Sequence, residues 1–215
     1  MAKTVAELFQ ESIKTVALSS PLRPGTAEQF VYYIETLLKW NKVINLTGFT
    51  SASDIIQHLI LEAFPLRTFL EELHLPDDIT MHDLGAGAGF PGIPLRILWD
   101  HGTYIMIEIR EKRALFLAQL LANLKLSRTE VHRGSFEAYF AQKACQSDLI
   151  LSKACLTQAK LFQAADTYAQ ENGILVCFSH TEPPVSYKNW DCIAKKAYNL
   201  PKKTHWLGAF KRTKP

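Results

Sequence analysis

The most informative stretch of this sequence reads His82-Asp83-Leu84-Gly85-Ala86-Gly87-Ala88-Gly89-Phe90-Pro91-Gly92. It follows a short apolar run at 79–84 that predicts a strand, and it leads into a helix predicted at 91–99. Glycine lets a chain turn sharply and lets the backbone approach a ligand without a Cβ in the way. Because ligands of open α/β sheets bind at the carboxyl ends of the strands, this loop predicts a binding site.

A carboxylate supports the same site from the next strand. Glu108 closes a strand predicted at 104–109 and stands 23 residues after Gly85, near the roughly 20 expected of a nucleoside site, where an acid accepts ribose hydroxyls. The spacing G-x-G-x-G differs from the G-x-G-x-x-G of dinucleotide sites, and Phe90-Pro91 crowds the helix start where a pyrophosphate would bind. A nucleoside without phosphates fits, and S-adenosylmethionine is one. A nicotinamide-dependent dehydrogenase, or a tight turn without a ligand, remains the alternative.

The pattern around this loop predicts an α/β fold. Strands are expected at 79–84, 104–109, 129–132, 149–152, 174–179, 192–198 and 206–211, and helices between them at 91–99, 111–124, 136–143 and 157–170. Alternation of this kind favours a mostly parallel sheet covered on both faces. The connection at 200–204 is too short for a parallel crossover, so the last two of the seven strands should form an antiparallel hairpin. This arrangement is typical of the class I (Rossmann-like) methyltransferase fold.

The first 75 residues have a helical pattern instead. Helices are expected at 4–17, 26–40, 53–62 and 65–73, and Thr26 with Gln29 predicts a capping box for the second of them. We therefore expect an N-terminal helical extension at 1–75 and an S-adenosylmethionine-binding domain at 76–215.

Composition restricts the class of protein. The chain has 215 residues, 47% hydrophobic and 21% charged, which is ordinary for a globular protein. It has no apolar run near the roughly 20 residues of a membrane-spanning helix, no signal-peptide core and no metal-ligand spacing among its four cysteines. We expect a cytoplasmic monomer without a metal or a membrane partner.

Net charge is only +3, but basic residues crowd the last 21 positions. They are Lys195, Lys196, Lys202, Lys203, Lys211, Arg212 and Lys214. Such clustering either attracts phosphate or forms a solvated face.

Four segments carry a closer likeness. Residues 83–95, with Gly-Phe-Pro-Gly-Ile-Pro at their centre, resemble the signature of the bacterial small-subunit ribosomal RNA guanine-N7 methyltransferases, also called glucose-inhibited division protein B. Trp40–Thr47 is similar to the family's Trp-Asn-Lys…Asn-Leu-Thr motif, Lys112–Leu117 to its Lys-Arg-x-x-Phe-Leu helix, and Ser152–Ala154 to its Ser-Arg-Ala motif. The likeness spans roughly residues 28–155.

The resemblance implies a cofactor, S-adenosyl-L-methionine, and a partner, ribosomal RNA or the small ribosomal subunit. It places the cofactor-binding residues at Gly85, Ala86, Gly87, Phe90, Glu108, Ser135, Phe136 and Lys153. Lys153 and Asn45 are the candidates for substrate contact. Guanine N7 has a lone pair and no proton, so we expect no catalytic base.

The chain also departs from the family pattern. Lys153 stands where the family has Arg, and Glu108 where it usually has Asp. The family often has Asp-Ser shortly after the N-terminal His, whereas here His58 is followed by Leu-Ile-Leu-Glu. The helix after the second strand starts at Arg110-Glu111, where the family prefers small residues, and Ser179-His180 stands where the family has Lys-Gly after the fifth strand. A methyltransferase for another nucleic acid or a small molecule, and a non-enzymatic module that binds RNA or a partner, therefore remain alternatives.

Overall fold

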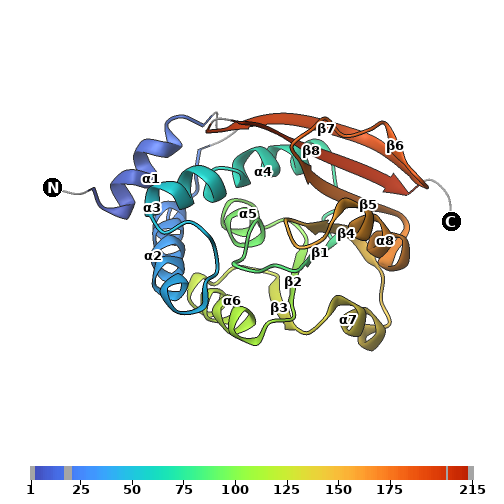
Figure 1. The fold of residues 1–215 in the computed structure, drawn as a ribbon, viewed down its shortest axis with the longest axis horizontal. Helices are drawn as coiled ribbons and strands as arrows, with labels where there is room; N and C mark the ends of the chain where they lie inside the picture. Colours follow the sequence, from blue (N-terminus) through green and yellow to red (C-terminus); the bar gives the residue numbers. More distant parts are fainter. Residues whose placement is uncertain (1–2, 17–20, 202, 213–215) are drawn as a thin grey trace.

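A computed structural model describes residues 3–16, 21–201 and 203–212. Within them, one mixed sheet has the strand order β3-β2-β1-β4-β5-β8-β7-β6 (Figure 1). The strands are β1 Thr80–Leu84, β2 Thr103–Glu108, β3 Thr129–Arg133, β4 Ser147–Ser152, β5 Ala169–Ser179, β6 Ser186–Tyr187, β7 Trp190–Leu200 and β8 Lys203–Arg212. Strands β1 to β5 are parallel, and β8, β7 and β6 are added to β5 in antiparallel pairs.

The structure confirms the predicted α/β fold class and corrects the number and bounds of the strands. All seven expected strands are present, and β7 and β8 form the expected antiparallel hairpin. The described chain adds an eighth strand, β6, which has only two residues and pairs with the start of β7. So short a strand has no periodicity to detect. Strand β5 also begins five residues earlier than expected, because Ala169 pairs with Ser147 of β4.

Helices cover both faces of the sheet. On one face α5 Gly92–Leu98 and α6 Glu111–Leu124 pack with the N-terminal helices, and on the other lie α7 Phe136–Lys143 and α8 Gln158–Tyr168 (Figure 1). Each face has its own apolar cluster, and β1 and β2 contribute side chains to both. Strands buried on both faces explain the continuous apolar runs seen in the sequence.

The N-terminal helices are α1 Val5–Ile13, α2 Thr26–Ile44, α3 Ala52–Ile55 and α4 Ala63–Glu72. Three expectations are wrong here. The single helix expected at 53–62 is α3 followed by a π-helical turn, η1 Ile56–Ile60, and the described part of the first helix ends at Ile13. The capping box expected at Thr26 is absent from the start of α2, where left-handed Gly25 is the N-cap, whereas Thr4 and Glu7 form one at α1. Among the described residues, no helix is both long and apolar enough to cross a membrane.

The N-terminal helices share one core with α5 and α6. Phe30, Tyr33 and Leu37 of α2 are fully buried in it, and the Tyr33 hydroxyl donates a 2.7 Å hydrogen bond to the Ala88 carbonyl oxygen. The helical segment therefore supports the glycine loop directly. A domain boundary at residues 75 and 76 stays a prediction.

Candidate functional site: a nucleoside-type pocket at the strand ends

The glycine loop turns back on itself just after β1. Gly85 has φ +77° and Gly87 has φ +60°, values that residues with a Cβ rarely adopt. The amides of Gly85 and Ala86 both donate to the Ile107 carbonyl oxygen, at 2.9 and 3.1 Å, which anchors the bend to the end of β2. A Cβ at Gly85 would overlap the Cys155 side chain, so glycine is required there by space as well as by φ.

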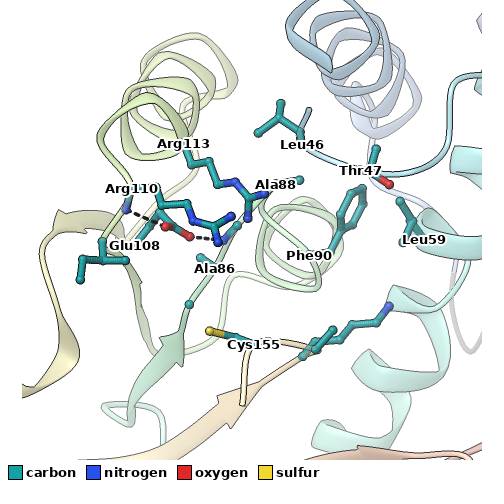
Figure 2. A pocket seen from close by; sticks show the side chains of 15 residues that line it. Leu46, Thr47, Leu59, Ala86, Ala88, Phe90, Glu108, Arg110, Arg113 and Cys155 are labelled. Carbon is teal, nitrogen blue, oxygen red and sulfur yellow. Dashed lines mark hydrogen bonds between the residues drawn. The ribbon is translucent and has the colours of Figure 1, made fainter. Parts of the chain in front are cut away.

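The Glu108 carboxylate is fixed at the centre of this arrangement. Its Oε2 accepts the Gly87 backbone N–H at 2.8 Å and its Oε1 accepts the Arg110 N–H at 2.8 Å, as the dashed lines of Figure 2 show. A carboxylate oxygen can accept more than one hydrogen bond, so both oxygens of Glu108 retain acceptor capacity. The loop and the acid that the sequence singled out are therefore joined by a hydrogen bond.

A cavity of about 420 Å³ opens over the bend. It is lined by Leu46, Thr47, Leu59, Gly85, Ala86, Gly87, Ala88, Phe90, Glu108, Ile109, Arg110, Arg113, Lys153, Ala154 and Cys155. In Figure 2, Glu108 and the two arginines lie at one end, and Phe90, Thr47 and Leu59 at the other. The pocket thus has a polar, charged end and a more apolar end.

Most of the expected site residues meet in this lining. Of the cofactor candidates, it contains Gly85, Ala86, Gly87, Phe90, Glu108 and Lys153. Ser135 and Phe136 lie just outside it, although Gly134 beside them donates to the Glu108 carbonyl oxygen at 3.1 Å. The Ser135 hydroxyl caps α7 by accepting from the Ala138 N–H, and the Phe136 ring packs edge-on against Tyr168. Their assignment to the adenine side stays a prediction.

Asn45 reaches the site through its backbone. It ends α2 in the left-handed region, and its carbonyl oxygen accepts a 3.4 Å hydrogen bond from the Arg113 guanidinium. The side chain that orders the following turn is Asn41, which accepts from the Thr47 N–H and donates to the Phe49 carbonyl oxygen. Sequence reasoning gave Asn41 no role beyond its place in the Trp-Asn-Lys motif, because its partners lie six and eight residues along the chain.

Lys153 belongs to the pocket lining, and its ammonium meets a buried acid. Its ammonium pairs with Glu62, a residue 2% exposed at the start of α4, and the other oxygen of Glu62 accepts from the Tyr198 hydroxyl of β7. Burial lowers the pKa of Lys153 to about 8. The lysine therefore titrates close to neutral pH, unlike an exposed lysine.

Asp83 is buried behind the bend. One of its oxygens accepts from the Tyr104 hydroxyl at 3.1 Å, and the other has no hydrogen-bond partner among the described residues. Burial raises the pKa of Asp83 to about 8, with the Tyr104 hydrogen bond lowering it and the Glu108 charge raising it further. Asp83 is therefore mainly a neutral carboxylic acid at pH 7.

Sequence reasoning missed three more side chains of the lining. Ile109 is 66% exposed although apolar, and it lies beside the acid in the pocket. Its position directly after a strand-ending acid was the available signal. Arg110 and Arg113 bring positive charge to the same end, and Arg113 belongs to the Lys-Arg segment that the resemblance already marked.

Comparison with known proteins agrees with this geometry. The sequence model of the family described as GidB, rRNA small subunit methyltransferase G, matches residues 26–203. The chain is 37% identical over 182 residues to the Ribosomal RNA small subunit methyltransferase G of Lawsonia intracellularis, covering 84% of each chain. It is 38% identical over 176 residues to that of Nitratidesulfovibrio vulgaris, covering 81% of this chain and 80% of the relative.

Solved structures show the same fold at low sequence identity. A structure from Klebsiella pneumoniae described as an O-methyltransferase aligns with a TM-score of 0.60 at 13% identity, covering 96% of each chain. NSun6 from Pyrococcus horikoshii, solved with SFG, aligns with a TM-score of 0.53 at 14% identity, covering 70% of this chain and 52% of that one. The class I methyltransferase fold is thereby confirmed. The match of the family model over most of the chain, together with the identity to its members, shows that this protein belongs to the rRNA small subunit methyltransferase G family.

Proposed function

We propose that this protein transfers a methyl group from S-adenosyl-L-methionine to N7 of a guanine in small-subunit ribosomal RNA. One observation carries the proposal: the left-handed glycine bend opens on the cavity, and Glu108 is held beside it by two backbone N–H groups. A ribosomal RNA substrate would place the protein in the cytoplasm.

The polar end of the pocket fits the cofactor. Glu108 offers free acceptor capacity to two ribose hydroxyls, and the exposed face of Ile109 offers an apolar surface to adenine. The Arg113 guanidinium lies near Gly87 and its bond to Asn45 is long, so it is free to meet a carboxylate such as that of the methionine part.

The reaction demands positioning more than proton transfer. When bound, S-adenosylmethionine supplies a methyl group already activated by its sulfonium. Guanine N7 presents a lone pair and carries no proton, so the protein's task is to hold N7 in line with that methyl group. Alignment of this kind supplies roughly 7–11 kcal/mol of rate acceleration. Phe90, Leu59 and Lys153 line the end of the pocket at which we place the base.

The surface that meets RNA phosphates is best placed at the pocket rim. In the C-terminal hairpin, Lys195 pairs with Glu182 and Lys196 with Glu72, so part of the basic cluster is neutralised; Lys202 and Lys214 lie outside the described residues. Around the pocket, Lys112 is exposed and the two arginines line the mouth. RNA binding through these groups should weaken steeply with salt.

The cofactor assignment is tested by isothermal titration with S-adenosylmethionine. Changing Glu108 to Gln replaces one carboxylate oxygen by an NH₂ group, which then faces the N–H of Gly87 or Arg110. We therefore expect roughly 10- to 100-fold weaker binding of S-adenosylmethionine. Glu111→Gln is the matched control, because Glu111 is exposed and its ion pair with Arg133 lies at the surface. Absence of heat with the unaltered protein would favour the non-enzymatic module.

The target base is tested by nucleoside mass spectrometry of ribosomal RNA from a deletion strain, with and without the gene restored. Loss of one 7-methylguanosine in the small subunit, regained on restoration, is the expected result. Unchanged 7-methylguanosine together with cofactor binding would indicate a methyltransferase with another substrate.

A further inference from the structure

Three parts of the chain that are far apart in sequence meet at Lys153, a residue of the pocket lining. Lys153 follows β4, Glu62 joins η1 to α4, and Tyr198 belongs to β7 of the C-terminal hairpin. The Glu62 carboxylate binds both others, accepting from the Lys153 ammonium with one oxygen and from the Tyr198 hydroxyl with the other. Glu62 is 2% and Tyr198 8% exposed, so water does not compete freely for these bonds.

Other titratable groups surround this trio. The His205 ring of β8 stacks on Tyr198 with ring centres 5.5 Å apart, and His180, after β5, packs against His205 at 4.8 Å. His58 of η1 stacks on Phe49 at 5.0 Å. After burial, charges on His180, Lys153, Lys203 and His58 all lower the pKa of His205. Glu62 is therefore the acid among several groups that are neutral or positive.

The charge of this end matters for the reaction. Transfer breaks the bond between sulfur and the methyl carbon, leaving its electron pair on sulfur, and the N7 lone pair forms the new bond. The positive charge moves from sulfur to the base, and no proton is transferred. Guanine presents O6 beside N7 as a second acceptor, so an ammonium there orients the base. An unpaired ammonium would also oppose the charge that develops on the ring.

We propose that Glu62 and Tyr198 are positioning residues for methyl transfer. They hold the Lys153 ammonium where it donates to guanine O6, and the Glu62 carboxylate offsets the positive charge that the methylated base acquires. One donor of the ammonium is used by Glu62, which leaves others for the base. This inference rests on the proposed guanine-N7 activity.

A purely structural role accounts poorly for this arrangement. A buried ion pair adds little net stability, because desolvation of both groups opposes their attraction. The same two elements, α4 and β7, are already joined at the surface by Glu72 and Lys196. A further link between them therefore does not require a buried carboxylate bonded to a lysine of the pocket lining.

The test compares Glu62→Gln and Tyr198→Phe with Glu72→Gln, which breaks the surface link between α4 and β7 and leaves the pocket intact. Each variant is assayed for 7-methylguanosine formation on small-subunit ribosomal RNA, with kcat and KM separated, and for S-adenosylmethionine affinity by titration. We expect kcat to fall roughly 100-fold for Glu62→Gln and about tenfold for Tyr198→Phe. KM for RNA and cofactor affinity should stay within about threefold, and Glu72→Gln should match the unaltered protein.

The pH profile adds a readout that a structural role would not change. The unaltered protein should lose kcat as pH rises through about 8, where Lys153 gives up its proton. Without the Glu62 charge the pKa of Lys153 falls, so the alkaline limb of Glu62→Gln should move to lower pH. If Glu62→Gln does not fold, Tyr198→Phe, which removes a single oxygen, decides the matter.

Values of kcat close to those of the unaltered protein in either folded variant would overturn the proposal. So would a loss of kcat matched by an equal loss in Glu72→Gln. If the unaltered protein makes no 7-methylguanosine, the proposed function itself fails. This result is obtained before any variant is compared, so it is distinguishable from a failure of the positioning role.

Discussion

Replacing Asp83 with Asn should abolish the fall in stability between pH 6.5 and 8. The Asp83 carboxyl is fully buried, and burial raises its pKa from 3.8 to about 8. Between these values the folded protein holds a proton that the unfolded chain releases, so stability falls as pH rises, by about 1.4 kcal/mol per pH unit. Asn has the shape of the neutral carboxyl group and does not titrate.

His82, the preceding residue, acts in the opposite direction. Burial lowers its pKa from 6.5 to about 4, so over that interval the unfolded chain binds the extra proton and stability rises with pH. The two slopes cancel below pH 6.5. Burial also lowers the pKa of Lys153 to about 8, and that lysine adds stability only as pH rises further. From pH 6.5 to 8 Asp83 makes the largest contribution, a loss of about 1.6 kcal/mol, because it is half ionised at the upper end of the interval. The ends of the His82 and Lys153 titrations oppose it by about 0.4 kcal/mol each, which leaves a net loss of about 1 kcal/mol.

Thermal unfolding of the ligand-free protein, followed by circular dichroism at constant ionic strength, measures this effect. For a chain of this length about 1 kcal/mol corresponds to a fall in Tm of roughly 2–4 °C from pH 6.5 to 8. Asp83→Asn should show no fall in Tm over the same range, because His82 and Lys153 only raise stability with pH. Asp78→Asn, at an exposed position, should behave like the unaltered protein. Parallel curves for the unaltered protein and Asp83→Asn would refute the assignment of a neutral buried acid.

Two further substitutions test how the glycine bend is built. Gly85→Ala forces a Cβ into the Cys155 side chain at a backbone φ of +77°. The free energy of unfolding should therefore fall by about 2–3 kcal/mol, and titration should show at least about tenfold weaker cofactor binding. The control is Gly48→Ala, which has nothing within 4 Å of the added atom and should leave both quantities unchanged. Tyr33→Phe leaves the buried Ala88 carbonyl without its donor, so chemical denaturation should show a loss of about 1–2 kcal/mol. An unchanged midpoint and slope for Tyr33→Phe would show that α2 does not support the bend.

Local sequence was sufficient for the centre of the site. The bend depends on residues that tolerate positive φ, and the acid depends on where the next strand ends, so both are encoded within a few neighbouring residues. The structure places Glu108 within 2.8 Å of the Gly87 nitrogen, as this reasoning requires. Alternation of strands and helices likewise predicted the class of sheet, because periodicity reports which faces are buried.

Features set by long-range packing were not predictable. The sequence marks Glu62 only within a departure from the family pattern and gives no signal at Tyr198, because Glu62 meets Lys153 and Tyr198 across 91 and 136 positions of the chain. The π-helical turn η1 and the two-residue strand β6 also leave no periodic trace in the sequence.

By itself, the sequence determined the α/β class, the glycine bend and the acid beside it, since each follows from backbone preferences over short distances. Tertiary structure alone decided which charges are paired, which acid is neutral, and which side chains close the far end of the pocket. Pairing and burial depend on what the folded chain brings into contact and removes from water, and no local pattern contains that information.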